Sequence, residues 1–168
     1  MKVGTADLAA SASHLTIVEA MGANSLHSSA SRPAEVRATA ALALLGAWTI
    51  VVPYLATALG LEVKVSSLVE VVDHVVPGVL VAAAGFYLTM LARRRSLAGA
   101  TSALLAGGVC FLAGFWVLST HVPLLADAAR SASVSWAAAL WHSSTAVPVV
   151  ALALWCVLRS SSAADPAR

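Results

Sequence analysis

Four long stretches without any Asp, Glu, Lys or Arg constrain this chain more than any other feature. They cover residues 38–61, 75–92, 96–126 and 131–158. Crossing the hydrocarbon core of a bilayer as a helix takes about 20 apolar residues. The chain as a whole is 60% hydrophobic and only 11% charged, well outside the balance of soluble domains. The pattern predicts an all-α fold, a four-helix transmembrane bundle.

The second half of this bundle repeats the first at an offset of 68 positions, with no gap. The offset aligns Leu44, Gly46 and Trp48 with Leu112, Gly114 and Trp116. It also aligns His74 with His142. Matches of Ala or Val occur by chance in such a composition, but Gly-x-Trp and a histidine at membrane depth are rarer. We therefore interpret the chain as two tandem parallel two-helix repeats, related by roughly half a turn about the membrane normal.

The repeat predicts four parts along the chain. They are a flexible cytoplasmic N-terminal tail (1–36), a first transmembrane hairpin (37–92), a second transmembrane hairpin (96–159) and a short cytoplasmic tail (160–168). Within the first tail, the Ser-rich segment 24–33 is expected to be a linker. Helix one is expected to begin after Pro33, with Glu35 in its first turn.

Three consecutive arginines, Arg93 to Arg95, lie between the two hairpins. Basic residues accumulate in cytoplasmic loops. The two connections on the other side of the membrane have Lys64 and Arg130 as their only basic residues. We therefore expect a multi-pass protein of the inner (plasma) membrane of the cell, with both termini cytoplasmic. The lipid bilayer is its expected partner, and a homo-oligomer or a larger membrane complex remains open. A net charge of +2, with scattered basic residues, does not indicate nucleic acid.

The first helix of each repeat combines Gly-x-Trp with a proline. The first copy reads GAWTIVVPYL and the second GFWVLSTHVPLL. The motif residues are Gly46, Trp48, Pro53, Gly114, Trp116 and Pro123. This arrangement resembles the SPW-repeat family of bacterial integral membrane proteins, in which Ser-Pro-Trp follows such a stretch. Here Val52 and Tyr54 flank Pro53, and His121 occupies the position aligned with it. The resemblance implies the fold but no established activity.

Ionisable residues form a polar cluster in the predicted outer half of the membrane. They are Glu70, Asp73, His74, His121 and His142. A charge at the centre of a spanning helix costs about 2.5–3.5 kcal/mol on insertion scales, so such groups face the bundle or water. His74 and His142 are accordingly predicted to point into the bundle, because hydrocarbon leaves an imidazole unsatisfied.

Hydrogen-bond partners are available to both repeated histidines. Glu70 or Asp73, on the same helix, is expected to accept from the ring of His74. The hydroxyl groups that follow His142 are expected to serve that ring, and they belong to Ser143, Ser144 and Thr145. We favour this ordinary hydrogen-bonded role over a metal shell or a proton relay.

Three functions from different classes remain open. We favour a structural or accessory membrane module. The second is a b-type haem-binding electron-transfer subunit that uses His74 and His142, with haem b as the cofactor. The third is a small transporter or ion-binding protein with a polar site in the outer half.

No catalytic motif is found in the sequence, so we expect no enzyme and name no catalytic residue. No metal ligand is named either. Cys110 and Cys156 lie inside apolar runs, without a partner at metal-ligand spacing. Both are interpreted as small buried apolar residues.

Overall fold

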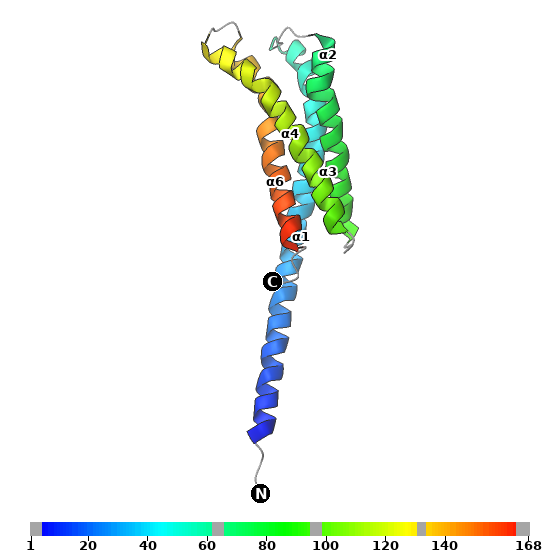
Figure 1. Ribbon diagram of the computed structural model, residues 1–168, viewed down its shortest axis with the longest axis vertical. Helices are drawn as coiled ribbons and strands as arrows, with labels where there is room; N and C mark the ends of the chain where they lie inside the picture. Colours follow the sequence, from blue (N-terminus) through cyan, green and yellow to red (C-terminus); the bar gives the residue numbers. More distant parts are fainter. Residues whose placement is uncertain (1–4, 62–65, 95–98, 131–133, 164–168) are drawn as a thin grey trace. The chain divides into compact units, whose positions relative to one another are not determined.

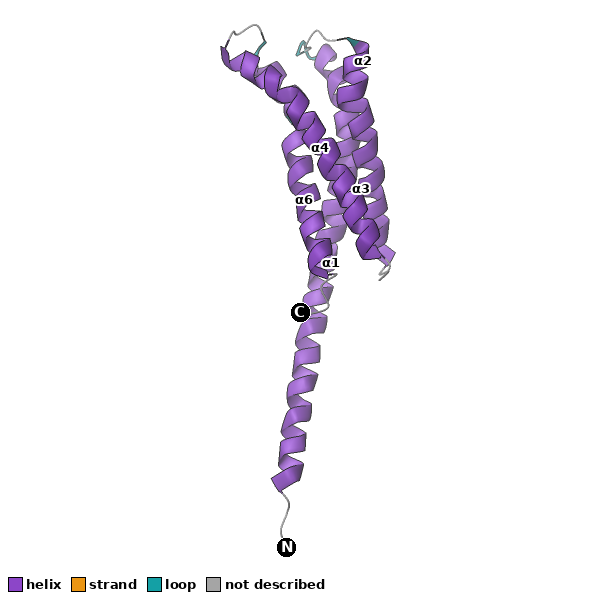
Figure 2. Cartoon of the chain, viewed as in Figure 1, coloured by secondary structure: helices purple, strands orange, loops and turns teal. Residues whose placement is uncertain are grey.

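The computed structural model describes residues 5–61, 66–94, 99–130 and 134–163, with the side chains of residues 5–31, 100, 162 and 163 excepted. Its helices are α1 (Thr5–Ala58), α2 (Ser67–Glu70), the π-helix η1 (Val71–Val75), α3 (Val76–Arg94), α4 (Gly99–Arg130), α5 (Trp136–Ser143) and α6 (Ala146–Ala163). Among these residues there is no strand, and the predicted all-α four-helix fold is confirmed (Figure 2).

Four helical stretches are long and apolar enough to cross a membrane. They are Arg32–Ala58, Ser67–Arg94, Thr101–Arg130 and Trp136–Ser161. The second stretch consists of α2, η1 and α3, and the fourth consists of α5 and α6. Length and composition are thus those of a small multi-pass integral membrane protein, as the uncharged runs predicted.

The chain divides into two units, Met1–Ala34 and Glu35–Arg168. In the first unit, α1 already begins at Thr5. The prediction that helix one begins after Pro33 is therefore wrong, and residues 24–33 are helical where a linker was expected. Alanine is the strongest helix former and serine is tolerated, so a segment rich in both does not end a helix. Proline removes only one backbone hydrogen bond, and the helix continues through it.

In the second unit, α4 packs against α3, α5 and α6. Figure 1 shows these helices alongside the second half of α1. A hydrogen bond of 3.1 Å from Thr89 Oγ1 to Thr39 Oγ1 joins α3 to α1. The C-terminal ends of α1 and α4 lie at the same end of the bundle as the N-terminal end of α2 (Figure 1). We call this end the connection end. The helices that follow the connections, α2 and α5, each begin with a serine N-cap. Ser66 accepts a hydrogen bond from the N–H of Val69, and Ser135 accepts one from the N–H of Ala138.

Glycines bring the backbones of each hairpin into close contact. A Cβ atom on Gly46 would lie 2.7 Å from the carbonyl oxygen of Gly78, and it would also meet the backbone of Ala82. A Cβ atom on Gly114 would lie 3.2 Å from the backbone nitrogen of Val150. Gly46 and Ala82 have the same spacing as Gly114 and Val150, although the atoms nearest to Gly114 belong to the side chains of Val149 and Val150. The internal repeat and the half-turn relation between the hairpins stay predictions.

Replacing Gly46 by alanine should destabilise the bundle, because the added methyl group meets backbone that cannot move aside. We expect the free energy of unfolding in detergent to fall by about 1–3 kcal/mol, the usual effect of overpacking. Gly108→Ala is the matched control, since a Cβ atom there meets nothing within 4 Å. Its free energy of unfolding should change by less than about 1 kcal/mol. Equal losses in the two variants would contradict the close contact of α1 with α3.

Candidate metal centre

His74 lies on η1, the short π-helical segment of the second span. The N–H of Val76 donates to the carbonyl of Val71, five residues earlier, so this turn is wider than an α-helical one. Pro77 follows and lacks a backbone N–H. The side chain of His74 is only 4% exposed and points inward, as predicted. Single π-helical turns occur preferentially at functional sites.

His121 lies on α4, two residues before Pro123, and it is 5% exposed. Its Nδ1 is 2.7 Å from the carbonyl oxygen of Val117. A carbonyl can only accept, so Nδ1 carries the proton and the lone pair is on Nε2. Backbone carbonyls orient metal-binding histidines in this way, leaving the second nitrogen as the donor to the ion.

His142 lies in the last turn of α5, just before the helix is interrupted. α5 ends at Ser143 and α6 begins at Ala146. The imidazole is 3% exposed, so its predicted inward orientation is also confirmed. Trp141, the preceding residue, donates a hydrogen bond of 3.1 Å from Nε1 to the carbonyl of Val52 on α1. Its ring also packs edge-on against that of Trp48, with the ring centroids 6.0 Å apart. These contacts fix α5, and with it His142, against α1.

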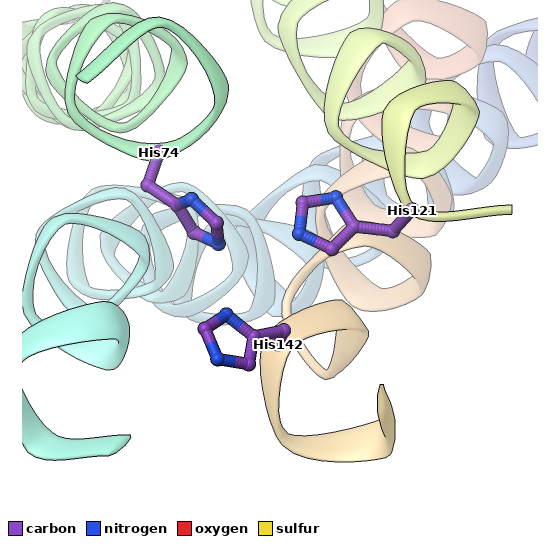
Figure 3. Close-up of side chains that lie close together, drawn as sticks. All are labelled: His74, His121 and His142. Carbon is purple, nitrogen blue, oxygen red and sulfur yellow. The ribbon is translucent and has the colours of Figure 1, made fainter. Parts of the chain in front are cut away.

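The three imidazoles meet inside the bundle (Figure 3). The ring centroid of His74 lies 4.9 Å from that of His121 and 5.6 Å from that of His142. The centroids of His121 and His142 are 6.4 Å apart. One ring nitrogen from each residue can be chosen so that all three lie within 4.8 Å of one another. Each histidine is about two helical turns from the connection end. Three different spans thus supply the cluster.

Three of the six ring nitrogens of this cluster lack a hydrogen-bond partner among the described residues. Neither ring nitrogen of His74 has a partner among the described residues, and the same is true of Nε2 of His142. The buried hydroxyl of Thr145 is also without one. A buried polar group without a partner costs about 1–3 kcal/mol. Such groups in a folded protein require an explanation, and a bound ion is one of those available.

The prediction that Ser143, Ser144 or Thr145 bonds to the ring of His142 is wrong. Ser143 donates instead to the carbonyl of Ala139, and Ser144 donates to that of Trp141. Hydroxyl groups in helices often bond to the backbone three or four residues earlier, so they are not available to a neighbouring ring.

The prediction that Glu70 or Asp73 accepts a hydrogen bond from His74 is also wrong. Glu70 and Asp73 are half-buried, and neither accepts a hydrogen bond from His74. Asp73 interacts electrostatically with His121 instead. Carboxylates are costly at membrane depth, which favours half-exposed positions near the start of a helix.

Three converging neutral imidazoles fit a single transition-metal ion. Zinc binds imidazole nitrogen at about 2.0–2.1 Å, which places tetrahedral donors about 3.4 Å apart. The three ring nitrogens are now up to 4.8 Å apart. Side-chain rotations that move each nitrogen by about 1 Å would bring them to the separation that zinc requires. A porphyrin would have to extend as a plate between two axial rings. The ring of His121 already lies beside those of His74 and His142, so the cluster fits an ion better than haem b.

Comparison of the chain with protein-family models, with curated proteins and with solved structures found no match. The resemblance to the SPW-repeat family therefore stays a prediction.

Sequence reasoning named all three histidines but did not bring them together as metal ligands. The repeat paired His74 with His142 and left His121 as the residue aligned with Pro53. His121 and His142 are separated by a loop and belong to neighbouring spans, so no short ligand motif exists. Their similar depth in the membrane is the feature of the sequence that could have grouped them. Each histidine lies six to nine residues from the end of its helical span that is located at the connection end.

Replacing His74 by leucine should stabilise the metal-free protein, because a side chain of similar size removes two buried nitrogens without partners. We expect the free energy of unfolding in detergent with chelator to rise by about 1 kcal/mol. His121→Leu is the matched control, since it also removes the hydrogen bond from Nδ1 to Val117 and should gain less or lose stability. A clear loss of stability in His74→Leu would show that His74 makes a stabilising hydrogen bond, in contradiction to its two nitrogens without partners.

Proposed function

We propose that this chain is a small integral membrane protein that binds one transition-metal ion between His74, His121 and His142. The observation that carries the proposal is the group of buried ring nitrogens without hydrogen-bond partners. Of the three functions that the sequence left open, this one belongs to the ion-binding class.

A purely structural role fits these residues poorly. Replacing buried polar groups by apolar groups of the same shape is often neutral or stabilising. Leucine or phenylalanine at these positions would pack the bundle without unsatisfied nitrogens. Residues that lower stability in this way are typical of sites kept for function.

Imidazole is a ligand suited to zinc, copper, iron and nickel. It binds metal in its neutral form, so binding releases any proton that the ring carries and weakens as the pH falls. If the arginine cluster faces the cytoplasm, as proposed from the sequence, the connection end and its site lie toward the opposite side of the membrane. The ion would then be taken from outside the cytoplasm.

The purified protein in detergent should retain about one metal ion per chain after exposure to a mixture of zinc, cobalt, nickel and copper salts and removal of free ions. Elemental analysis by mass spectrometry measures the content. His74→Leu, His121→Leu and His142→Leu should each lose the ion, because two imidazoles do not replace three.

The other two histidines of the sequence are His14 and His27, in its N-terminal part. A His14→Leu/His27→Leu variant is the control for unspecific binding to histidine, and it should retain the ion. Metal that remains in a variant lacking all three clustered histidines would overturn the proposal. A Soret absorption band that disappears in His74→Leu and His142→Leu would replace it by haem binding.

A further inference from the structure

The donors of the cluster carry no charge, and this limits which ion the site can hold. The residues that come together are three histidines, with no carboxylate and no thiolate among them. All three are buried, at 3–5% exposure. We propose that the ion is monovalent copper, Cu(I), bound by three imidazole nitrogens. This inference rests on the proposed function and adds the identity of the ion to it.

The charge of the ion decides between copper(I) and divalent metals. The free energy of transferring an ion from water to a medium of low dielectric constant rises with the square of its charge, so a divalent ion costs roughly four times as much as a monovalent one. Neutral ligands do not offset that charge. Asp73 is a half-buried carboxylate on η1, one residue before His74, and it is not one of the three converging ligands. A single carboxylate outside the ligand set offsets the charge of a divalent ion less completely than that of Cu(I).

The number of donors points the same way. Zinc in proteins is nearly always four-coordinate, and a site with three protein ligands keeps water or substrate in the fourth position. Copper(I) is stable with three donors in a plane. Here one donor comes from η1, one from α4 and one from α5, so the three surround a common centre from three sides (Figure 3). The apolar surroundings supply no further ligand from histidine, cysteine or carboxylate among the described residues.

Two buried thiols are the competing donors for Cu(I), because thiolate is a softer ligand than imidazole. Cys110 on α4 and Cys156 on α6 are both free and lie in the same buried core cluster. Along α4, Cys110 precedes His121 by eleven residues, which is about three turns. The thiols are thus well separated from the three rings. Binding at the histidines has to be measured with the thiols removed.

The test titrates a Cys110→Ala/Cys156→Ala protein in detergent with Cu(I), without oxygen, against the coloured copper(I) chelator bicinchoninate. Zinc is titrated in parallel against a zinc-binding dye. We expect about one Cu(I) per chain, with a Kd at least about a hundredfold below that for zinc, because burying a divalent ion among neutral ligands costs more than burying a monovalent one. Adding His121→Leu to this variant should abolish Cu(I) binding, whereas adding His14→Leu and His27→Leu should leave it unchanged.

Should the variant without cysteines fail to fold, the wild-type protein and His121→Leu alone are compared, and the variant should bind one Cu(I) fewer. Zinc bound at the histidines as tightly as Cu(I) would overturn this inference while leaving the proposed function intact. Cu(I) binding that follows the cysteines instead of the histidines would also overturn it. Absence of every ion from the histidines would overturn both.

Discussion

The central constraint on this bundle is the burial of three imidazole rings, because three of their six nitrogens have no hydrogen-bond partner among the described residues. Several other buried side chains do have local partners, as when Thr49 donates to the carbonyl of Leu45 and Thr39 donates to that of Glu35. Both ring nitrogens of His74 and Nε2 of His142 have no such bond. Because unsatisfied polar groups are most costly in an apolar bundle, the cluster lowers stability unless something binds to it. An ion held by three lone pairs removes that penalty.

Irregular helices bring the rings together. Each histidine has a proline within the next six residues of its span, and these are Pro77, Pro123 and Pro148. The second span contains η1 and the fourth is interrupted between α5 and α6. Interrupted helices are tolerated at membrane depth where protein covers the freed backbone groups. The bond from Trp141 to the carbonyl of Val52 shows how one interrupted segment is fixed to a neighbouring helix.

The sequence predicted those features that depend on the composition of a single helix. Charge-free runs predicted four spans, and the cost of exposing imidazole to lipid predicted that His74 and His142 face inward. The convergence of His121 with them depends on how three spans are rotated and packed, which the pattern of one helix does not determine. The same holds for the partners of Ser143 and Ser144. The start of α1 was missed because Pro33 was read as a boundary, although Ala-rich flanks favour a helix on both sides.

X-ray absorption spectroscopy at the edge of the metal in the loaded protein tests the three-histidine site most directly. We expect nitrogen scatterers at about 2.0 Å together with the outer-shell scattering typical of imidazole rings, fitted best by three rings. Loss of that outer-shell scattering in His121→Leu would agree with the same assignment. Sulfur scatterers at about 2.3 Å, or oxygen ligands without imidazole scattering, would contradict it.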